Sequence, residues 1–458
     1  MAAVVTTEFV TQLIKDSKKS FDGNLYIGLG KSTTWGVGDT PETPLTTFEY
    51  ARESRGRIQH VKIVTGVAAA IPRQDWTSQE IYVAYDDSDQ ADIPYVMNSN
   101  YEVFLCTQQG VNNDGVVIPS TVEPTKAQLT FSSPNILAGE NILRTADSGA
   151  ATDRGYEWRY LFTVSQEAVN RFLTLNYIPV FTFETDPQDE DVQSEQFEIQ
   201  GISQDGQVLS VLVEDGGVGY SSPTATIQGN GSGAIAEINV VSQEIRSVVI
   251  LSNNHGSNYD VASVAVDDGV IPTETATLRC IIGPKGGIEA DPIKTLKASN
   301  LIVTTDFEDD EFSTLLTEND FRQVCLLKDP LAYGTSNPFS GFTSAGNRAL
   351  ITQGGEPQMN VDSIIEGTVS GAKAIVDFHD TVNNYIYFHQ EKTTGFANFQ
   401  QGESIGNGTS NADILNNASF ILEPGVDVYS GEILYINNIT PIARDPNQTE
   451  DIKIIITF

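Results

Sequence analysis

The residues that could bind a nucleotide fall in two glycine-containing stretches. Gly30-Lys31-Ser32 resembles the end of a phosphate-binding loop, but that motif needs a glycine five positions before Gly30, where Leu25 stands. The run 229–233 is glycine-rich, yet residues 234–240 alternate as a strand, whereas a dinucleotide site needs a helix N-terminus there. We therefore interpret both stretches as turns beside strands.

Histidines and acidic clusters are the candidates for metal binding. The four histidines are His60, His255, His379 and His389, and no two have the i, i+4 spacing of a helical metal site. His379 and His389 flank an expected hairpin and could face each other across it. The clusters 86–89 and 306–311 could bind calcium, but neither has the glycine at position six or the later glutamate of an EF-hand loop. The favoured interpretation is solvated acidic loops, with no metal and no cofactor.

Catalytic patterns are equally sparse. No Gly-x-Ser-x-Gly elbow occurs, although a Ser-His-Asp triad assembled in space stays open. No pair among the 61 acidic residues stands out for acid–base work. The three cysteines, Cys106, Cys280 and Cys325, form no CxxC pair and are typical of small buried thiols in a reducing compartment. The sequence therefore predicts a protein that is not an enzyme.

The net charge of the chain restricts the classes of partner that it is expected to bind. With 61 acidic and 26 basic residues in 458, the formal net charge is -35, which disfavours nucleic acid and an anionic membrane surface. Such acidity could complement a basic patch on a partner protein. The N-terminus lacks the basic and apolar regions of a signal peptide, and no apolar run approaches a membrane span. We expect synthesis in the cytoplasm, unless the protein leaves as part of a particle.

The hydrophobic pattern predicts a mainly β protein with few short helices. One amphipathic helix is expected near the start, with Thr7 as its cap, and a second at Gln166–Leu175 with Ser165 as its N-cap. A strand is expected at Asn24–Gly30. Further β-branched and aromatic runs predict strands at Glu80–Tyr85, Tyr101–Thr107, Tyr156–Val164, Tyr177–Phe183 and Leu301–Thr304.

Two stretches read as additional β modules. Residues 206–282 look internally duplicated, because Gln207–Val213 is echoed by Glu244–Ile250, each followed by a Gly and a Tyr and another alternating run. Residues 362–414 predict a third module, in which Asn383-Asn384 would connect two strands as a hairpin turn. The acidic run 186–191 separates two β regions and is interpreted as a loop or boundary.

Several aromatic-anchored blocks carry a resemblance when taken in order. They are Ile71–Trp76, Tyr156–Phe162, Phe321–Val324 leading into Asp329–Leu331, and Ser430–Asn437 continuing to Phe458. Together they resemble the baseplate wedge subunit of T4-type contractile bacteriophages, the gene product eight family. The matched positions are Arg73, Asp75, Trp76, Tyr156, Trp158, Tyr160, Phe162, Phe321, Arg322, Gln323, Gly431, Glu432, Tyr435, Gln448, Thr449, Glu450 and Phe458.

The resemblance covers residues 4–183, 294–331 and 430–458. It implies a mostly β, non-enzymatic, homodimeric protein of the virion's tail baseplate, in contact with other wedge subunits, with no catalytic or cofactor residues. The expected organisation is several β-sandwich-like domains. Among them, a family-like region 1–190 is completed by 291–335 and 429–458, so that a core domain is assembled from discontinuous N- and C-terminal segments. Residues 195–290 and 336–428 would be inserted β modules.

Two sets of aromatic residues leave alternatives open. Tyr156, Trp158, Tyr160 and Phe162 share one strand face, which is either domain core, the favoured interpretation, or a protein interface. The other set comprises Tyr385, Tyr387, Phe388, Phe396 and Phe399. If exposed, it would favour the alternative function, an outward-facing carbohydrate- or receptor-binding appendage; core is again favoured.

Overall fold

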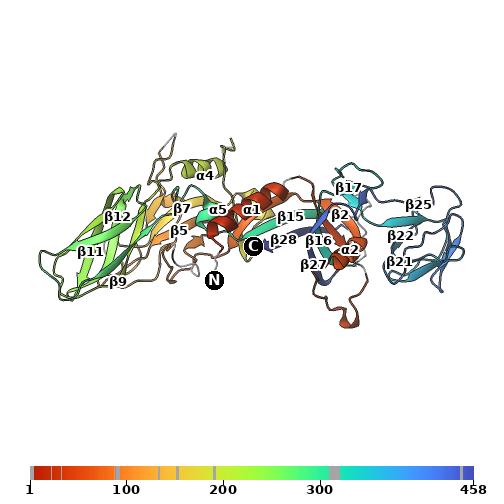
Figure 1. Ribbon diagram of the computed structural model, residues 1–458, viewed down its shortest axis with the longest axis horizontal. Coiled ribbons are helices and arrows are strands. Elements are labelled where there is room, and N and C mark those ends of the chain that lie inside the picture. Colours follow the sequence, from red (N-terminus) through yellow and green to blue (C-terminus); the bar gives the residue numbers. More distant parts are fainter. Residues whose placement is uncertain are drawn as a thin grey trace. The chain divides into compact units, whose positions relative to one another are not determined.

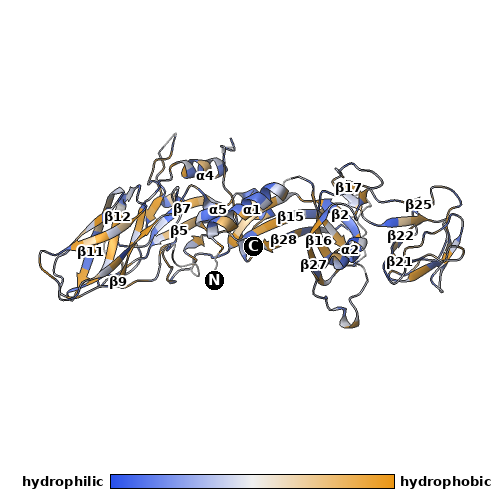
Figure 2. Cartoon of the chain, viewed as in Figure 1, coloured by the Kyte–Doolittle hydropathy of each residue, from blue (hydrophilic) through white to orange (hydrophobic). Residues whose placement is uncertain are grey.

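The computed structural model confirms the mainly β class, with 42% of residues in strands and 12% in helices (Figure 1). The structure describes all residues except 1–4, 22, 32, 87, 89–92, 133–134, 151–153, 189–191, 309–319 and 444–446. Within the described ranges the strands form seven antiparallel sheets. Apolar residues concentrate on these strands (Figure 2), as expected where sheets bury one or both faces.

The chain divides into two compact units, which are described separately. Unit 1 contains residues 1–15, 68–302 and 456–458, and unit 2 contains residues 16–67 and 303–455. The chain passes from one unit to the other within four elements: helix α1 (Thr7–Phe21) and strands β3 (Gly66–Pro72), β15 (Asn300–Glu308) and β28 (Thr449–Thr457).

The first sheet of unit 1 has an aromatic core. It has the order β4-β5-β7-β6, with β4 at Tyr95–Met97, β5 at Glu102–Gln108, β6 at Ile142–Arg144 and β7 at Glu157–Thr163. Tyr156, Trp158 and Tyr160 are fully buried in one cluster, and the rings of Tyr156 and Trp158 stack 5.6 Å apart. Helix α4 (Val192–Gly201) adds Ile199 to the cluster. Phe162 is also buried, so the interpretation of this face as core is confirmed.

The stretch that looks duplicated forms a module with approximate two-fold symmetry. Its strands are β9 (Val208–Asp215), β10 (Thr224–Gly229), β11 (Ser232–Val241), β12 (Glu244–Ser257), β13 (Ala262–Asp267) and β14 (Thr277–Ile282). Strand β10 pairs with its counterpart β13, and β9 pairs with β12 through Val211 and Val248. The first copy contains β9, β10 and β11, and the second contains β12, β13 and β14. In the sheet order β11-β12-β9-β14, the third strand of each copy pairs with the first strand of the other copy. Tyr220 and Tyr259, one from each copy, lie in the shared core.

A small four-stranded sheet contains β8 and the three strands within which the chain passes from one unit to the other. The order is β28-β15-β3-β8, with β8 at Tyr177–Val180. Helices α3 (Gln166–Arg171) and α5 (Pro292–Thr295) flank these strands in sequence. Ser165 caps α3 as predicted, by accepting a hydrogen bond from Ala168 N. The cap expected of Thr7 is wrong by one residue, because α1 begins at Thr7 and Thr6 Oγ1 accepts from Phe9 N.

The central sheet of unit 2 joins the start, middle and end of the chain. Its order is β18-β2-β1-β16-β27, with β18 at Thr343–Ala345, β2 at Ile58–Ile63, β1 at Leu25–Gly30, β16 at Asp320–Lys328 and β27 at Glu432–Ala443. Every residue of β1 is buried, because β2 and β16 pair with its two edges and both of its faces are covered. Helix α2 (Phe48–Gly56) belongs to the same unit. As expected, discontinuous N- and C-terminal segments of the chain join in this one sheet.

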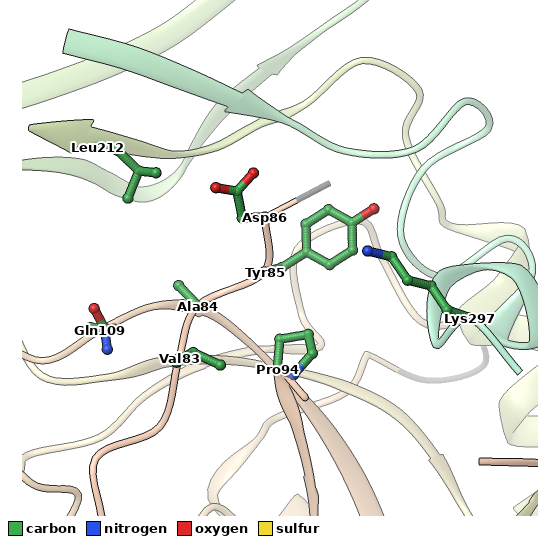
Figure 3. Close-up of a pocket in the computed structure, with 8 residues that line it drawn as sticks. All are labelled: Val83, Ala84, Tyr85, Asp86, Pro94, Gln109, Leu212 and Lys297. Atoms are coloured by element: carbon green, nitrogen blue, oxygen red, sulfur yellow. The ribbon is translucent and has the colours of Figure 1, made fainter. Parts of the chain in front are cut away.

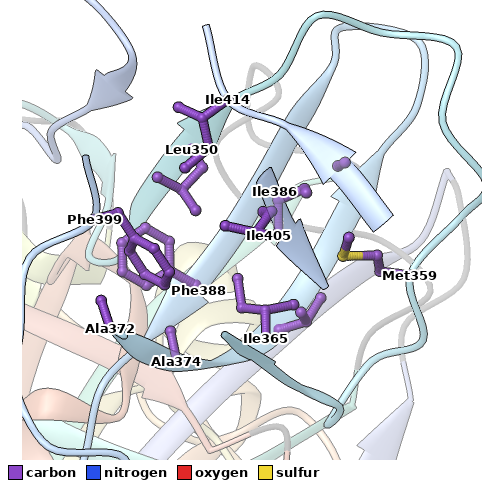
Figure 4. Close-up of a cluster of buried hydrophobic side chains, with 12 residues drawn as sticks. Leu350, Met359, Ile365, Ala372, Ala374, Ile386, Phe388, Phe399, Ile405 and Ile414 are labelled. Carbon is purple, nitrogen blue, oxygen red and sulfur yellow. The ribbon is translucent and has the colours of Figure 1, made fainter. Parts of the chain in front are cut away.

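A seven-stranded sheet forms the other part of unit 2. Its order is β24-β23-β20-β21-β22-β19-β25, with β19 at Arg348–Ile351, β20 at Ile364–Gly367, β21 at Lys373–Asp380, β22 at Tyr385–His389, β23 at Ser404–Gly406, β24 at Asn411–Asp413 and β25 at Ile421–Leu422. Its core, shown in Figure 4, includes Phe388 and Phe399 with ring centroids 5.6 Å apart. The predicted hairpin is confirmed, and Asn384 in its turn has φ 63°. A short pair, β17 (Leu331–Ala332) and β26 (Val426–Asp427), completes the unit.

Three predicted elements differ from the structure. Glu80–Tyr85 is not a strand, because its backbone makes only isolated bonds to neighbouring segments. The Tyr82 side chain is buried, and its hydroxyl donates to Thr77 O. The helix expected to reach Leu175 ends at Arg171, because Tyr177 bonds back to Thr174 and forms a turn. The strand expected to reach Phe183 ends at Val180. Polar helices α2 and α4 and the short α5 had no clear apolar periodicity and were not predicted.

Gly155 is where a side chain is least tolerated in unit 1. A Cβ atom there would lie 1.6 Å from the carbonyl oxygen of Thr145, so Gly155→Ala forces the backbone at the start of β7 to move. We expect a loss of about 1–3 kcal/mol in the free energy of unfolding, measured by urea denaturation. Gly201→Ala is the control, because no atom lies within 4 Å of its Cβ position. Equal stability of the two variants would contradict the prediction.

Candidate functional sites

A small pocket in unit 1 brings together an acid, a lysine and a tyrosine (Figure 3). Its volume is about 180 Å³, and its lining residues are Val83, Ala84, Tyr85, Asp86, Pro94, Gln109, Leu212 and Lys297. Arg279 donates hydrogen bonds to the Asp86 carboxylate, with Nη2 lying 2.6 Å from Oδ2. These bonds lower the pKa of Asp86 to about 2. Lys297 Nζ lies 5.9 Å from the Tyr85 ring centroid. Because the carboxylate is already paired, it is poorly suited to act as a general base.

A buried ionic network lies between the sheet β4-β5-β7-β6 and the duplicated module of unit 1. Glu157 on β7 is fully buried, accepts from Thr107 Oγ1 at 2.8 Å and from Arg144 Nη2 at 2.6 Å, and lies 3.2 Å from His255 Nε2 on β12. His255 Nδ1 in turn lies 2.9 Å from Val208 O. Burial alone would raise the pKa of Glu157, but attraction to His255 and Arg144 outweighs it and lowers the pKa to about 2.

A second buried pair continues this network. Arg159 Nη1 lies 3.0 Å from Glu289 Oε1 and 2.6 Å from Gln207 Oε1, and both charged side chains are almost fully buried. Burial raises the pKa of Glu289, but the Arg159 charge together with the hydrogen bonds from Asn141 and Arg159 outweighs burial, so the pKa is lowered. Each carboxylate of the network is paired with a basic side chain, and no residue of the network lines the small pocket of unit 1 or the larger pocket of unit 2. It has the character of a structural connection that fixes one module against the other.

The histidines do not form the arrangement considered from sequence. In the hairpin, His379 lies opposite Ile386 and His389 opposite Ile375, so the two do not face each other. His379 Nδ1 accepts from Met359 N, while His60 Nε2 bonds Thr343 Oγ1 at 2.7 Å. Among the described residues no group of three potential ligands could hold a metal ion. Of the two acidic clusters, Asp87, Asp89 and residues 309–311 lie outside the described part of the chain.

The first matched block holds the end of β3 to its surroundings. Arg73 Nε bonds the Asp75 carboxylate at 2.9 and 3.1 Å, and its Nη1 donates to Thr174 O. Trp76 packs against the aromatic core and donates from Nε1 to Ser120 Oγ. These contacts are structural and local to unit 1.

The later blocks hold β16 and β27 together in unit 2. Phe321 is buried, Arg322 pairs with Asp39 at 2.8 Å, and Gln323 Nε2 donates to Asn438 Oδ1. Gly431, with φ 65°, accepts from Arg55 Nη2.

The other matched positions lie on outer strands. On β27, Glu432 lies opposite Lys328 and Tyr435 opposite Leu326. Gln448 directly precedes β28, on which Thr449 and Glu450 lie, and the Phe458 amide donates to Ser299 O in unit 1.

A larger pocket in unit 2 was not predicted from the sequence. Its volume is about 290 Å³, and it is lined by Gly56, Tyr333, Gly346, Asn347, Arg348, Phe388, His389, Gln390, Phe396, Asn398, Pro424, Val426, Asp427, Val428 and Tyr429. The residues that line this pocket come from several separate segments of the chain, so no local sequence motif predicts it. Of the aromatic set weighed from sequence, Phe388 and Phe399 are core, Tyr387 is buried, and Phe396 is 66% exposed.

Comparison with known proteins adds no identification. No protein-family model matches the chain, and no curated protein matches it. Among the described residues, no helix is long and apolar enough to cross a membrane.

Proposed function

We propose that this protein is a structural subunit of a contractile phage tail baseplate wedge. It would bridge neighbouring wedge proteins, form a homodimer, and transmit baseplate rearrangement without catalysing a reaction. The observation that carries the proposal is the ordered set of sequence blocks that resemble the gene product eight family. Its place would be the tail baseplate of the virion, after assembly in the host cytoplasm.

The position of the blocks in the fold supports this proposal. They lie at the end of β3, on β7, on β16 and on β27, and they contribute core side chains and strand pairing. Residues that determine a fold are those expected to persist between distant relatives whose inserted modules differ. The two modules that depart from the family, within 195–290 and 336–428, contain complete strand pairings of their own.

The surface of the described residues also suits a protein that binds other proteins. Strand β27 is an edge of its sheet and exposes about 40% of both Leu434 and Ile442, and the edge strand β11 exposes half of Ile235. Exposed apolar residues on sheet edges are a liability unless a partner covers them. The net charge of -35 further favours partners with basic surfaces.

Reconstitution with the other wedge subunits of the same tail tests the proposal. We expect the purified chain to sediment as a dimer, and to form a stoichiometric complex when mixed with its wedge partners. Sedimentation velocity and size-exclusion chromatography would measure both.

Association driven only by the acidic charge must be distinguished from a specific interface. At high ionic strength, charge-only association weakens strongly, whereas a specific interface with apolar contacts persists. An unrelated acidic β protein of similar size serves as the control. A chain that stays monomeric and binds none of the wedge subunits would rule the proposal out.

A further inference from the structure

The larger pocket of unit 2 is surrounded by aromatic side chains that remain in contact with water. Tyr333, Phe396 and Tyr429 are exposed by 40%, 66% and 57%, and all three line the pocket. They come from three separate parts of the sequence. Rings gathered around one cavity, rather than scattered singly, are typical of a binding site.

One polar side chain in the wall of this pocket is fixed in orientation. His389 is almost completely buried, and its Nδ1 lies 2.6 Å from Asp377 Oδ1. Asp377 also accepts from Gln59 Nε2 at 2.9 Å and from Asn347 Nδ2 at 3.1 Å. Since Nδ1 is used, Nε2 is the nitrogen left for a ligand, and it makes no hydrogen bond with any described residue.

The charges around the pocket restrict what it can bind. Arg348, the only cationic side chain apart from His389 among the described lining residues, is already held by Glu423 through bonds of 2.7 and 2.8 Å. Asp427 adds a negative charge, and the exposed Asn398 adds a neutral amide. Because Arg348 is paired with Glu423 and His389 with Asp377, an anionic ligand would meet only cations that are already neutralised, and the unfavourable field of Asp427. The fitting ligand is uncharged, with hydroxyl groups and an apolar face that can stack on a ring.

We propose that this pocket binds a neutral saccharide. Tyr333, Phe396 and Tyr429 stack against the C–H faces of the sugar rings, and His389 and Asn398 bond the hydroxyl groups. This activity is independent of the proposed wedge role, because the pocket lies within unit 2 and shares none of the sequence blocks that carry that role.

Saturation-transfer NMR on the full chain tests the site. The probes are glucose, galactose, N-acetylglucosamine and their short oligosaccharides at millimolar concentration, with glucuronate as the anionic comparison. We expect saturation transfer to at least one neutral sugar and none to glucuronate. Phe396→Ala is expected to weaken binding about tenfold. Phe342→Ala is the matched control, since Phe342 is 76% exposed in the same unit but does not line the pocket.

Each other outcome counts against the saccharide site. Absence of transfer to every neutral sugar, preference for glucuronate, or an equal effect of the two Phe variants would overturn it, as would displacement of the sugar by aromatic peptides at lower concentration. Both substitutions are at exposed positions, so unchanged melting temperatures will show that the fold is intact. Complex formation with wedge subunits should be unaffected by Phe396→Ala, which separates this test from that of the wedge role.

Discussion

Glu157→Gln is expected to lower the free energy of unfolding of unit 1 by about 3 kcal/mol at neutral pH. The substitution removes the charge that compensates Arg144 and faces His255, while residue 157 and His255 remain fully buried and Arg144 remains mostly buried. Removing one partner from a buried ionic group is costly because the other charge stays desolvated. Urea denaturation would measure the loss in free energy of unfolding, and hydrogen exchange of the β6 and β7 amides in the native protein would show whether it is located in unit 1.

The same substitution should change how stability depends on pH. The pKa of Glu157 is about 2 in the folded protein, against an ordinary value of 4.5. A depressed carboxyl pKa contributes stability above the unfolded value, and this contribution is lost as the pH falls through the folded value. Wild-type stability should therefore decrease between about pH 4.5 and 2 by an amount that is missing in Glu157→Gln, and the two proteins should converge.

An exposed pair in the same unit is the control for Glu157. Glu237 pairs with Arg154 at 3.3 Å but is 60% exposed, so Glu237→Gln should cost under about 1 kcal/mol. If both Gln variants lose similar stability, or if the wild type and Glu157→Gln keep a constant difference down to pH 2, the network does not have the energetic role assigned to it.

Trp158→Ala is expected to destabilise unit 1 by about 3–5 kcal/mol. Trp158 has no exposed surface and contacts the rings of Tyr156 and Tyr82, with centroid distances of 5.6 and 5.5 Å. Truncation leaves a cavity that the paired strands β5 and β6 on either side of β7 cannot close. Calorimetry and near-ultraviolet circular dichroism would record the loss of the packed aromatic cluster.

Leu175→Ala provides the comparison for Trp158→Ala. Leu175 is 90% exposed in the same unit, so its truncation should change stability by less than about 0.5 kcal/mol. A small effect of Trp158→Ala, close to that of the exposed control, would mean that the aromatic cluster is loosely packed.

Much of the local structure could be predicted because local patterns determine it. The alternation of Tyr156, Trp158 and Tyr160 predicts both a strand and its core face, and Asn383-Asn384 predicts the hairpin turn. Errors arise where side-chain contacts override the pattern. In Glu80–Tyr85 the ring of Tyr82 packs into the aromatic core, and the backbone of the segment makes only isolated bonds to its neighbours.

Pairing between distant segments could not be predicted from one sequence. Glu157 and Arg159 alternate with the aromatic residues and would ordinarily face solvent, but residues of the duplicated module and Glu289 cover that side. The exchange of third strands between the two copies has no local signal either. The same holds for the saccharide pocket, whose rings Tyr333, Phe396 and Tyr429 become neighbours only after folding.

The central sheet of unit 2 has a consequence for how the protein folds on the ribosome. Strand β1 leaves the ribosome early, but its neighbour β16 and the edge strand β27 follow only after most of the chain has been made. The seven-stranded sheet between them in sequence can complete its pairing first. Strand β2 can pair with one edge of β1 early, but contacts of long sequence separation form slowly, so the edge of β1 that faces β16 stays unpaired meanwhile. Nascent chains of this protein are therefore expected to need chaperone protection until the last strands emerge.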